Sequence, residues 1–170
     1  MASLMDNLLE VLREEEKTYR GLIELSREKK DVLIRADIDR LTEITEAEQN
    51  ITSVLHGMET KRREVISDMA VVLHKKKEEL TIDMMLSILS KQPEEQKQLR
   101  EVRDRLRKTL DEMNLINSQN QLLLTQAMEM VEFDMTLFRS LRQAPETANY
   151  DRSAVNTGDL LGRSGFDAKQ

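Results

Sequence analysis

The longest periodic run of apolar residues lies between residues 99 and 141. Apolar residues recur there at alternating spacings of three and four, the heptad pattern of a helix that packs on other helices. No Pro or Gly interrupts the run, so we predict one long helix over about 94–142. Ten of its thirteen seam positions are apolar; the thirteen are Leu99, Val102, Leu106, Thr109, Met113, Ile116, Asn120, Leu123, Ala127, Met130, Asp134, Leu137 and Leu141.

A second face of the same predicted helix changes character along its length. It begins with Arg100, Arg103 and Arg107 and continues through neutral polar residues. Only its final third is apolar, with Leu124, Met128, Val131, Met135 and Phe138. This face could pack on another helix of the same bundle, or stay open for the amphipathic helix of a partner. Methionine side chains suit an adaptable docking surface.

The remaining periodic segments predict helices over 3–35 and 37–77, and a short connecting helix over 82–90. Ser3, Asp37 and Thr81 are expected to cap these three helices, and Pro93 to begin the long one. The second helix carries a heptad seam from Leu41 to Val72. Two polar residues interrupt this seam, Glu48 and Arg62, and we expect them to fix the register of packing.

The connections determine the expected topology. The break at 36–39 is short, so the first two helices should be antiparallel neighbours, and the link over 78–93 lets the long helix fold back. The fold class predicted is all-α, an elongated antiparallel three-helix bundle or coiled coil over residues 1–144. Three of the five glycines fall after residue 145, where no period is visible. We therefore expect a flexible tail over 145–170.

Composition narrows the function classes. Charged residues make up 34% of the chain and aromatics 3%, which suits long helices with narrow apolar stripes. The absence of Cys excludes disulfides and thiolate metal sites. A net charge of −6 argues against nucleic acid as a partner. No run of ~20 apolar residues and no basic signal-peptide region occurs, so we expect a cytoplasmic protein without stable membrane insertion.

No catalytic constellation emerges from the sequence. His56 and His74 are eighteen residues apart on one predicted helix, about 27 Å, which is too far to share a metal ion. There is no glycine-rich phosphate loop and no spaced His/Cys set. We expect no enzyme activity, no cofactor and no metal.

One motif resembles a known family. The stretch from Asn117 through Asn120 to Leu123 and Leu124 is similar to the Asn-x-x-Asn-x-x-Leu-Leu signature in the long C-terminal helix of FlgN-type flagellar export chaperones. The segments 37–41, 59–63 and 149–151 are also similar to that family, so the resemblance covers nearly the whole chain.

The resemblance implies a cytoplasmic type III export chaperone. Such a protein binds helical terminal segments of hook-associated proteins, prevents their premature association and delivers them to the export gate. Tyr150 would be the residue that contacts the gate. The expected client-binding residues are Asn117, Asn120, Leu124, Met128, Val131, Met135 and Phe138.

Two alternatives stay open at this stage. Asn120 occupies a seam position, where a lone Asn often sets register instead of binding a partner. The chain could also be a coiled-coil structural or tethering protein that self-associates through the same seams, and a homodimer remains open in either case.

Overall fold

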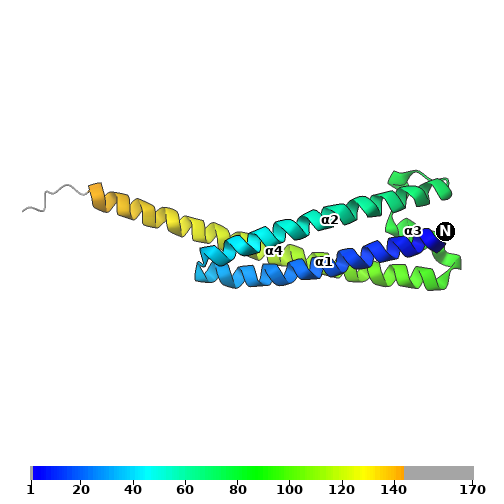
Figure 1. The fold of residues 1–170 in the computed structure, drawn as a ribbon, viewed down its shortest axis with the longest axis horizontal. Helices are drawn as coiled ribbons and strands as arrows, with labels where there is room; N and C mark the ends of the chain where they lie inside the picture. The colour runs from blue at the N-terminus through cyan, green and yellow to red at the C-terminus, as the bar shows by residue number, and fades with distance from the viewer. Residues whose placement is uncertain (1, 144–170) are drawn as a thin grey trace, which may run out of the picture. The chain divides into compact units, whose positions relative to one another are not determined.

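The computed structural model describes residues 2–143, and side chains from Leu4 to Arg142 (Figure 1). This part of the chain contains helices and no strand, which confirms the all-α class. The chain divides into two units, Met1–Met128 and Glu129–Gln170. The expected tail over 145–170 lies outside the described residues. The elements are α1 (Ala2–Arg35), α2 (Ile38–Val72), the 3₁₀ turn η1 (Lys77–Glu79), α3 (Ile82–Ile88), the 3₁₀ turn η2 (Leu89–Lys91) and α4 (Pro93–Gln143).

The first unit is a three-helix bundle of α1, α2 and the first part of α4 (Figure 1). Its main core joins Leu8 and Leu12 of α1 to Met69 of α2 and to Leu99 and Val102 of α4. The short helix α3 packs on this same core, and a smaller cluster follows further along the bundle. Burial of these apolar faces, more than helix propensity, is what stabilises such long helices.

Cross-helix ion pairs fix the helix directions within this unit. Lys29 of α1 pairs with Glu48 of α2, whereas Glu15, earlier in α1, pairs with the later Arg62. The two helices are therefore antiparallel. In contrast, Arg27 of α1 pairs with a residue of α4 that lies 85 positions ahead, and Arg13 shows the same offset. Because the residue numbers of α1 and α4 rise together from one pair to the next, the two helices run parallel, as the predicted up-down-up order requires.

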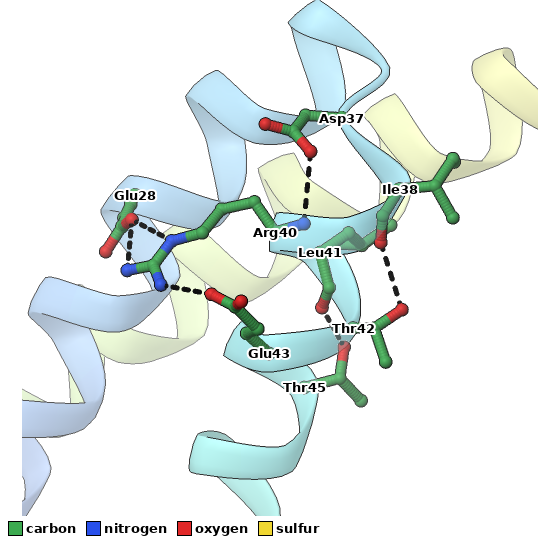
Figure 2. Close-up of polar contacts among 8 residues, drawn as sticks. All are labelled: Glu28, Asp37, Ile38, Arg40, Leu41, Thr42, Glu43 and Thr45. Atoms are coloured by element: carbon green, nitrogen blue, oxygen red, sulfur yellow. Dashed lines mark hydrogen bonds and ion pairs between the residues drawn. The ribbon is translucent and has the colours of Figure 1, made fainter.

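In the turn between α1 and α2, Asp37 takes part both in the cap that ends α1 and in the cap that begins α2. Ala36 adopts a left-handed backbone with φ of 54°. Its N–H donates to Leu33 O and the Asp37 N–H donates to Val32 O, the paired bonds that close a helix end. The Asp37 side chain then accepts a 3.0 Å hydrogen bond from the Arg40 amide and begins α2 (Figure 2). The prediction that Asp37 caps the second helix is confirmed.

Arg40 joins the two helices beside this turn (Figure 2). Its Nε donates to Glu28 Oε1 of α1 at 2.7 Å, and its Nη1 donates to Glu43 Oε2 at 2.6 Å. Thr42 and Thr45 donate their hydroxyls to carbonyls one turn earlier, those of Ile38 and Leu41. The Glu28 contact holds the first turn of α2 against α1, and the other three contacts lie within α2.

The second helix ends earlier than the sequence predicts. α2 stops at Val72 rather than near residue 77, and Val72 is exposed instead of lying in the seam. His74 has a positive φ of 49°, its N–H donates to Val71 O, and the Lys75 N–H donates to Ala70 O. This is the same closing pair of bonds as at Ala36. The sequence gives no glycine at either position, so the stop signal was absent from the residue types.

The other predicted helix starts can be compared directly. Thr81 accepts a 3.1 Å hydrogen bond from the Met84 amide and caps α3, as predicted. Pro93 is the first residue of α4, where its missing N–H removes no helix bond. The prediction for Ser3 was wrong, because α1 already begins at Ala2 and Ser3 lies inside the helix.

Candidate functional site

A polar layer crosses the bundle near the end of the buried part of α4. The side-chain amide of Asn120 donates a 2.7 Å hydrogen bond to the main-chain carbonyl of Ser26. The Ser26 hydroxyl donates to Glu48 Oε1 at 3.2 Å, and Lys29 Nζ lies 2.7 Å from Glu48 Oε2. Residues from all three helices thus meet in this layer, two from α1 and one each from α2 and α4, and Asn120 is buried in it.

A second polar layer lies nearer the other end of the bundle. Glu15 of α1 is only 3% exposed, and Arg62 Nη1 of α2 lies 3.4 Å from its Oε2, which has no hydrogen-bond partner. Burial raises the pKa of the Glu15 carboxyl, the charge of Arg62 lowers it, and Glu59 raises it; the net shift is upward. Glu48 and Arg62, the two polar interruptions of the α2 seam, therefore each face a charged partner on α1. Their effect on register stays a prediction.

The heptad seam of α4 passes from buried to exposed along the helix. It is buried from Leu99 to Asn120, apart from one half-buried position, and is half-buried at Leu123 and Ala127. The pairs that join α1 to α4 are offset by 85 to 94 residues. At this offset Arg35, the last residue of α1, comes level with the α4 residues that follow Asn120. Beyond this level α1 has ended and no longer covers α4.

The structure separates the seven predicted client-binding residues into three groups. Asn120 is buried in the polar layer, so it lies on no exposed surface. Leu124 is half-buried and Asn117 is exposed. The other four are exposed apolar side chains, Met128, Val131, Met135 and Phe138. Tyr150, the predicted gate contact, lies outside the described residues.

Among the described residues, the largest group of exposed apolar side chains belongs to residues 130–141 of α4, here called the distal apolar segment. Its apolar side chains, which keep 47–69% of their surface exposed, are Met130, Val131, Phe133, Met135, Leu137, Phe138 and Leu141. Four of them were missed as candidates, because Met130, Leu137 and Leu141 were assigned to the internal seam and Phe133 to neither face. Helix length was the signal that could have found them, since α4 has 51 residues and α1 has 34.

The described residues show few features of a catalytic or metal-binding site. No group of three or more His, Cys, Asp or Glu side chains between residues 4 and 142 could hold a metal ion. His56 is exposed and lies 3.8 Å from Glu59. Within the same range, no helix combines the length and the apolar character needed to cross a membrane. What distinguishes this part of the chain is an exposed apolar helix surface.

Comparison with known proteins gives one result. A family model described as "FlgN protein" matches residues 1–158. No curated protein and no solved structure matches the chain. The match covers nearly the whole sequence and agrees with the Asn-x-x-Asn-x-x-Leu-Leu motif in α4. The chain belongs to the FlgN family, a family of flagellar export chaperones.

Proposed function

We propose that this chain is a cytoplasmic type III export chaperone that binds the helical terminal segments of flagellar hook-associated proteins. Binding would keep these clients from associating before export, and the chaperone would deliver them to the export gate. The observation that carries the proposal is the exposure of the distal apolar segment. Membership of the FlgN family supplies the class of client.

The physical basis is burial of apolar surface on both partners. Seven apolar side chains within twelve residues are exposed here, and contiguous exposed apolar patches on proteins often mark interaction sites. A terminal segment that has little structure alone gains helix when it lays an apolar stripe on such a surface. Each apolar side chain that becomes fully buried contributes roughly 1.5–3 kcal/mol, less the cost of ordering the client.

Binding can be tested with charge insertions on the exposed surface. Val131→Glu and Phe138→Glu place a carboxylate among the apolar side chains, and we expect each to lower affinity for a full-length hook-associated protein at least tenfold. Thr136→Glu adds the same charge to the polar back of the helix and serves as the matched control. Because Val131 and Phe138 are exposed, all three variants should keep wild-type helicity. Wild-type affinity in both charge variants would refute the proposed binding surface.

Delivery is a separate step with a separate test. We propose that Tyr150 contacts the export gate, as the resemblance to the family implies. Tyr150→Ala should then leave client affinity unchanged in a purified system and reduce the amount of hook-associated protein exported by cells. Tyr150→Phe is the conservative control. Normal export with Tyr150→Ala would remove this residue from the delivery step.

Self-association through the same surface is the competing function. A structural or tethering protein would use the distal apolar segment to pair copies of itself. Sedimentation of the isolated chain over a wide concentration range distinguishes the two. A stable oligomer that Val131→Glu dissociates, together with no binding of any hook-associated protein, would replace the chaperone proposal.

A further inference from the structure

The distal apolar segment covers more than half of the helix circumference. Successive residues of an α-helix are about 100° apart around the axis. On that spacing the apolar residues of 130–141 occupy an arc of about 200°, with Phe133 at one edge and Met135 at the other. Within residues 130–141, the opposite side holds only charged or hydroxyl side chains: Glu132, Thr136, Arg139 and Ser140.

An arc of this width is too broad for one partner helix. A helix that packs on a single neighbour or core usually presents an apolar stripe about 100° wide. The buried part of α4 packs against both α1 and α2 in the main core through its single apolar seam. The distal apolar segment continues this seam and adds a second apolar face beside it, and its apolar side chains are exposed.

Asp134 lies at the centre of the apolar arc, between Phe133 and Met135 in sequence. It occupies the same heptad position as Asn120, two heptads further along α4. In the bundle, two polar residues at seam positions meet a partner on α1: Asn120 meets Ser26, and Glu48 meets Lys29. A carboxylate buried by a guest without such a partner would strongly weaken binding. The guest should therefore bring a cation to this point.

We propose that the client presents two apolar helices side by side, which cover the distal apolar segment as α1 and α2 cover the earlier part of α4. A Lys or Arg of the client lies between these helices and pairs with Asp134. This inference rests on the proposed function and adds the form and charge of the bound client.

A second copy of this chain fits the surface less well. Two copies of the segment paired in register would place Asp134 opposite Asp134, and like charges in such a contact are repulsive. One added helix would also leave part of the 200° arc uncovered. Both mismatches are removed by a different chain that carries two helices and a basic residue.

The number of helices is tested with the full chain and peptides of a hook-associated protein. The probes are its N-terminal helical peptide, its C-terminal helical peptide, their equimolar mixture and the whole protein, titrated by calorimetry. We expect either peptide alone to bind at least tenfold more weakly than the mixture or the whole protein. Leu137→Glu and Val131→Glu, on the two halves of the arc, should each weaken the whole protein at least tenfold, while Thr136→Glu should not.

The two-helix inference would be overturned if one peptide bound at 1:1 as tightly as the whole protein and only one of the two Glu substitutions weakened it. The proposed function would then still stand. Binding of no probe at all would instead defeat the proposed function. The chain could instead form a stable homodimer that excludes the client and that both Leu137→Glu and Val131→Glu dissociate. That result would assign the surface to a second copy.

The pairing of Asp134 has its own test. Asp134→Lys should lower affinity for the whole client at least tenfold, and Asp134→Asn should lower it less. Replacing the client's basic residues by Glu, one at a time, should restore binding to Asp134→Lys at one position only. If Asp134→Leu binds the client as tightly as the wild type, no cation faces this residue. Asp134 is exposed, so circular dichroism should show unchanged helicity in each variant.

Discussion

Asn120 of α4 donates a 2.7 Å hydrogen bond to the main-chain carbonyl of Ser26, in the middle of α1. The Ser26 hydroxyl in turn donates to Glu48 of α2. A carbonyl inside a helix already accepts one bond from its own helix, and its second lone pair is used here to hold a different helix. Ser26 is fully buried, so we expect this layer to favour one alignment of the three helices.

Two substitutions of Asn120 distinguish its contribution to stability from its role in fixing the alignment of the helices. Asn120→Ala removes the hydrogen bond and leaves a small cavity, so the free energy of unfolding should fall by about 1–3 kcal/mol. Asn120→Leu removes the same atoms, including a buried Oδ1 that has no partner, but fills the space with an apolar side chain and should cost less. We expect the Leu variant to lose the single alignment, which would appear as extra or broadened amide NMR peaks. Equal losses of stability in both variants with sharp single peaks would contradict this role.

Glu15 should make the stability of the bundle depend on pH. Its folded-state pKa is raised, mainly by burial, so the unfolded chain releases this proton at a lower pH than the folded chain does. As pH rises above about 4.5, the ionised carboxylate therefore destabilises the folded state increasingly. Glu15→Gln should remove this effect, so its stability relative to the wild type should increase from pH 4 to pH 7. Denaturant titrations at both pH values measure the difference, and a relative stability that decreases over this range would contradict the sign.

The sequence was sufficient for the all-α class, the up-down-up order and most helix limits, because heptad spacing reports directly on which side of a helix is buried. It failed at His74, since a left-handed helix end usually uses Gly and here uses His. It also failed to predict that Leu137 and Leu141 are exposed, because a heptad seam has the same sequence pattern whether or not another helix covers it. Whether a seam is covered depends on the lengths of the neighbouring helices, and these are set by their caps.

Two substitutions, one that removes a glycine and one that adds a glycine, test how backbone conformation contributes to stability. Gly21 lies inside α1, and a Cβ added there would meet nothing within 4 Å. Gly21→Ala should stabilise the fold by about 1 kcal/mol, because Ala is the better helix former. Ala36 has φ of 54°, so Ala36→Gly should also stabilise, by about 0.5–1 kcal/mol. Thermal unfolding of both variants measures the shift, and a lowered midpoint for Ala36→Gly would contradict the left-handed turn.

Two leucines at the same heptad position test where the seam of α4 changes role. Leu99 is fully buried in the main core, whereas Leu141 is 64% exposed. Leu99→Ala creates a cavity and should cost about 2–5 kcal/mol. Leu141→Ala should change the free energy of unfolding by less than about 0.5 kcal/mol, because no described neighbour packs on it.

Client binding should show the reverse order, with Leu141→Ala weakening affinity and Leu99→Ala leaving it unchanged at temperatures where that variant is folded. Both substitutions remove the same atoms from the same residue type in one helix, so helix propensity cancels in the comparison. Equal losses of stability would mean that the distal part of the seam is buried by this chain itself. In that case the apolar residues of 130–141 would stabilise the unbound fold, and a client could reach them only by displacing what covers them.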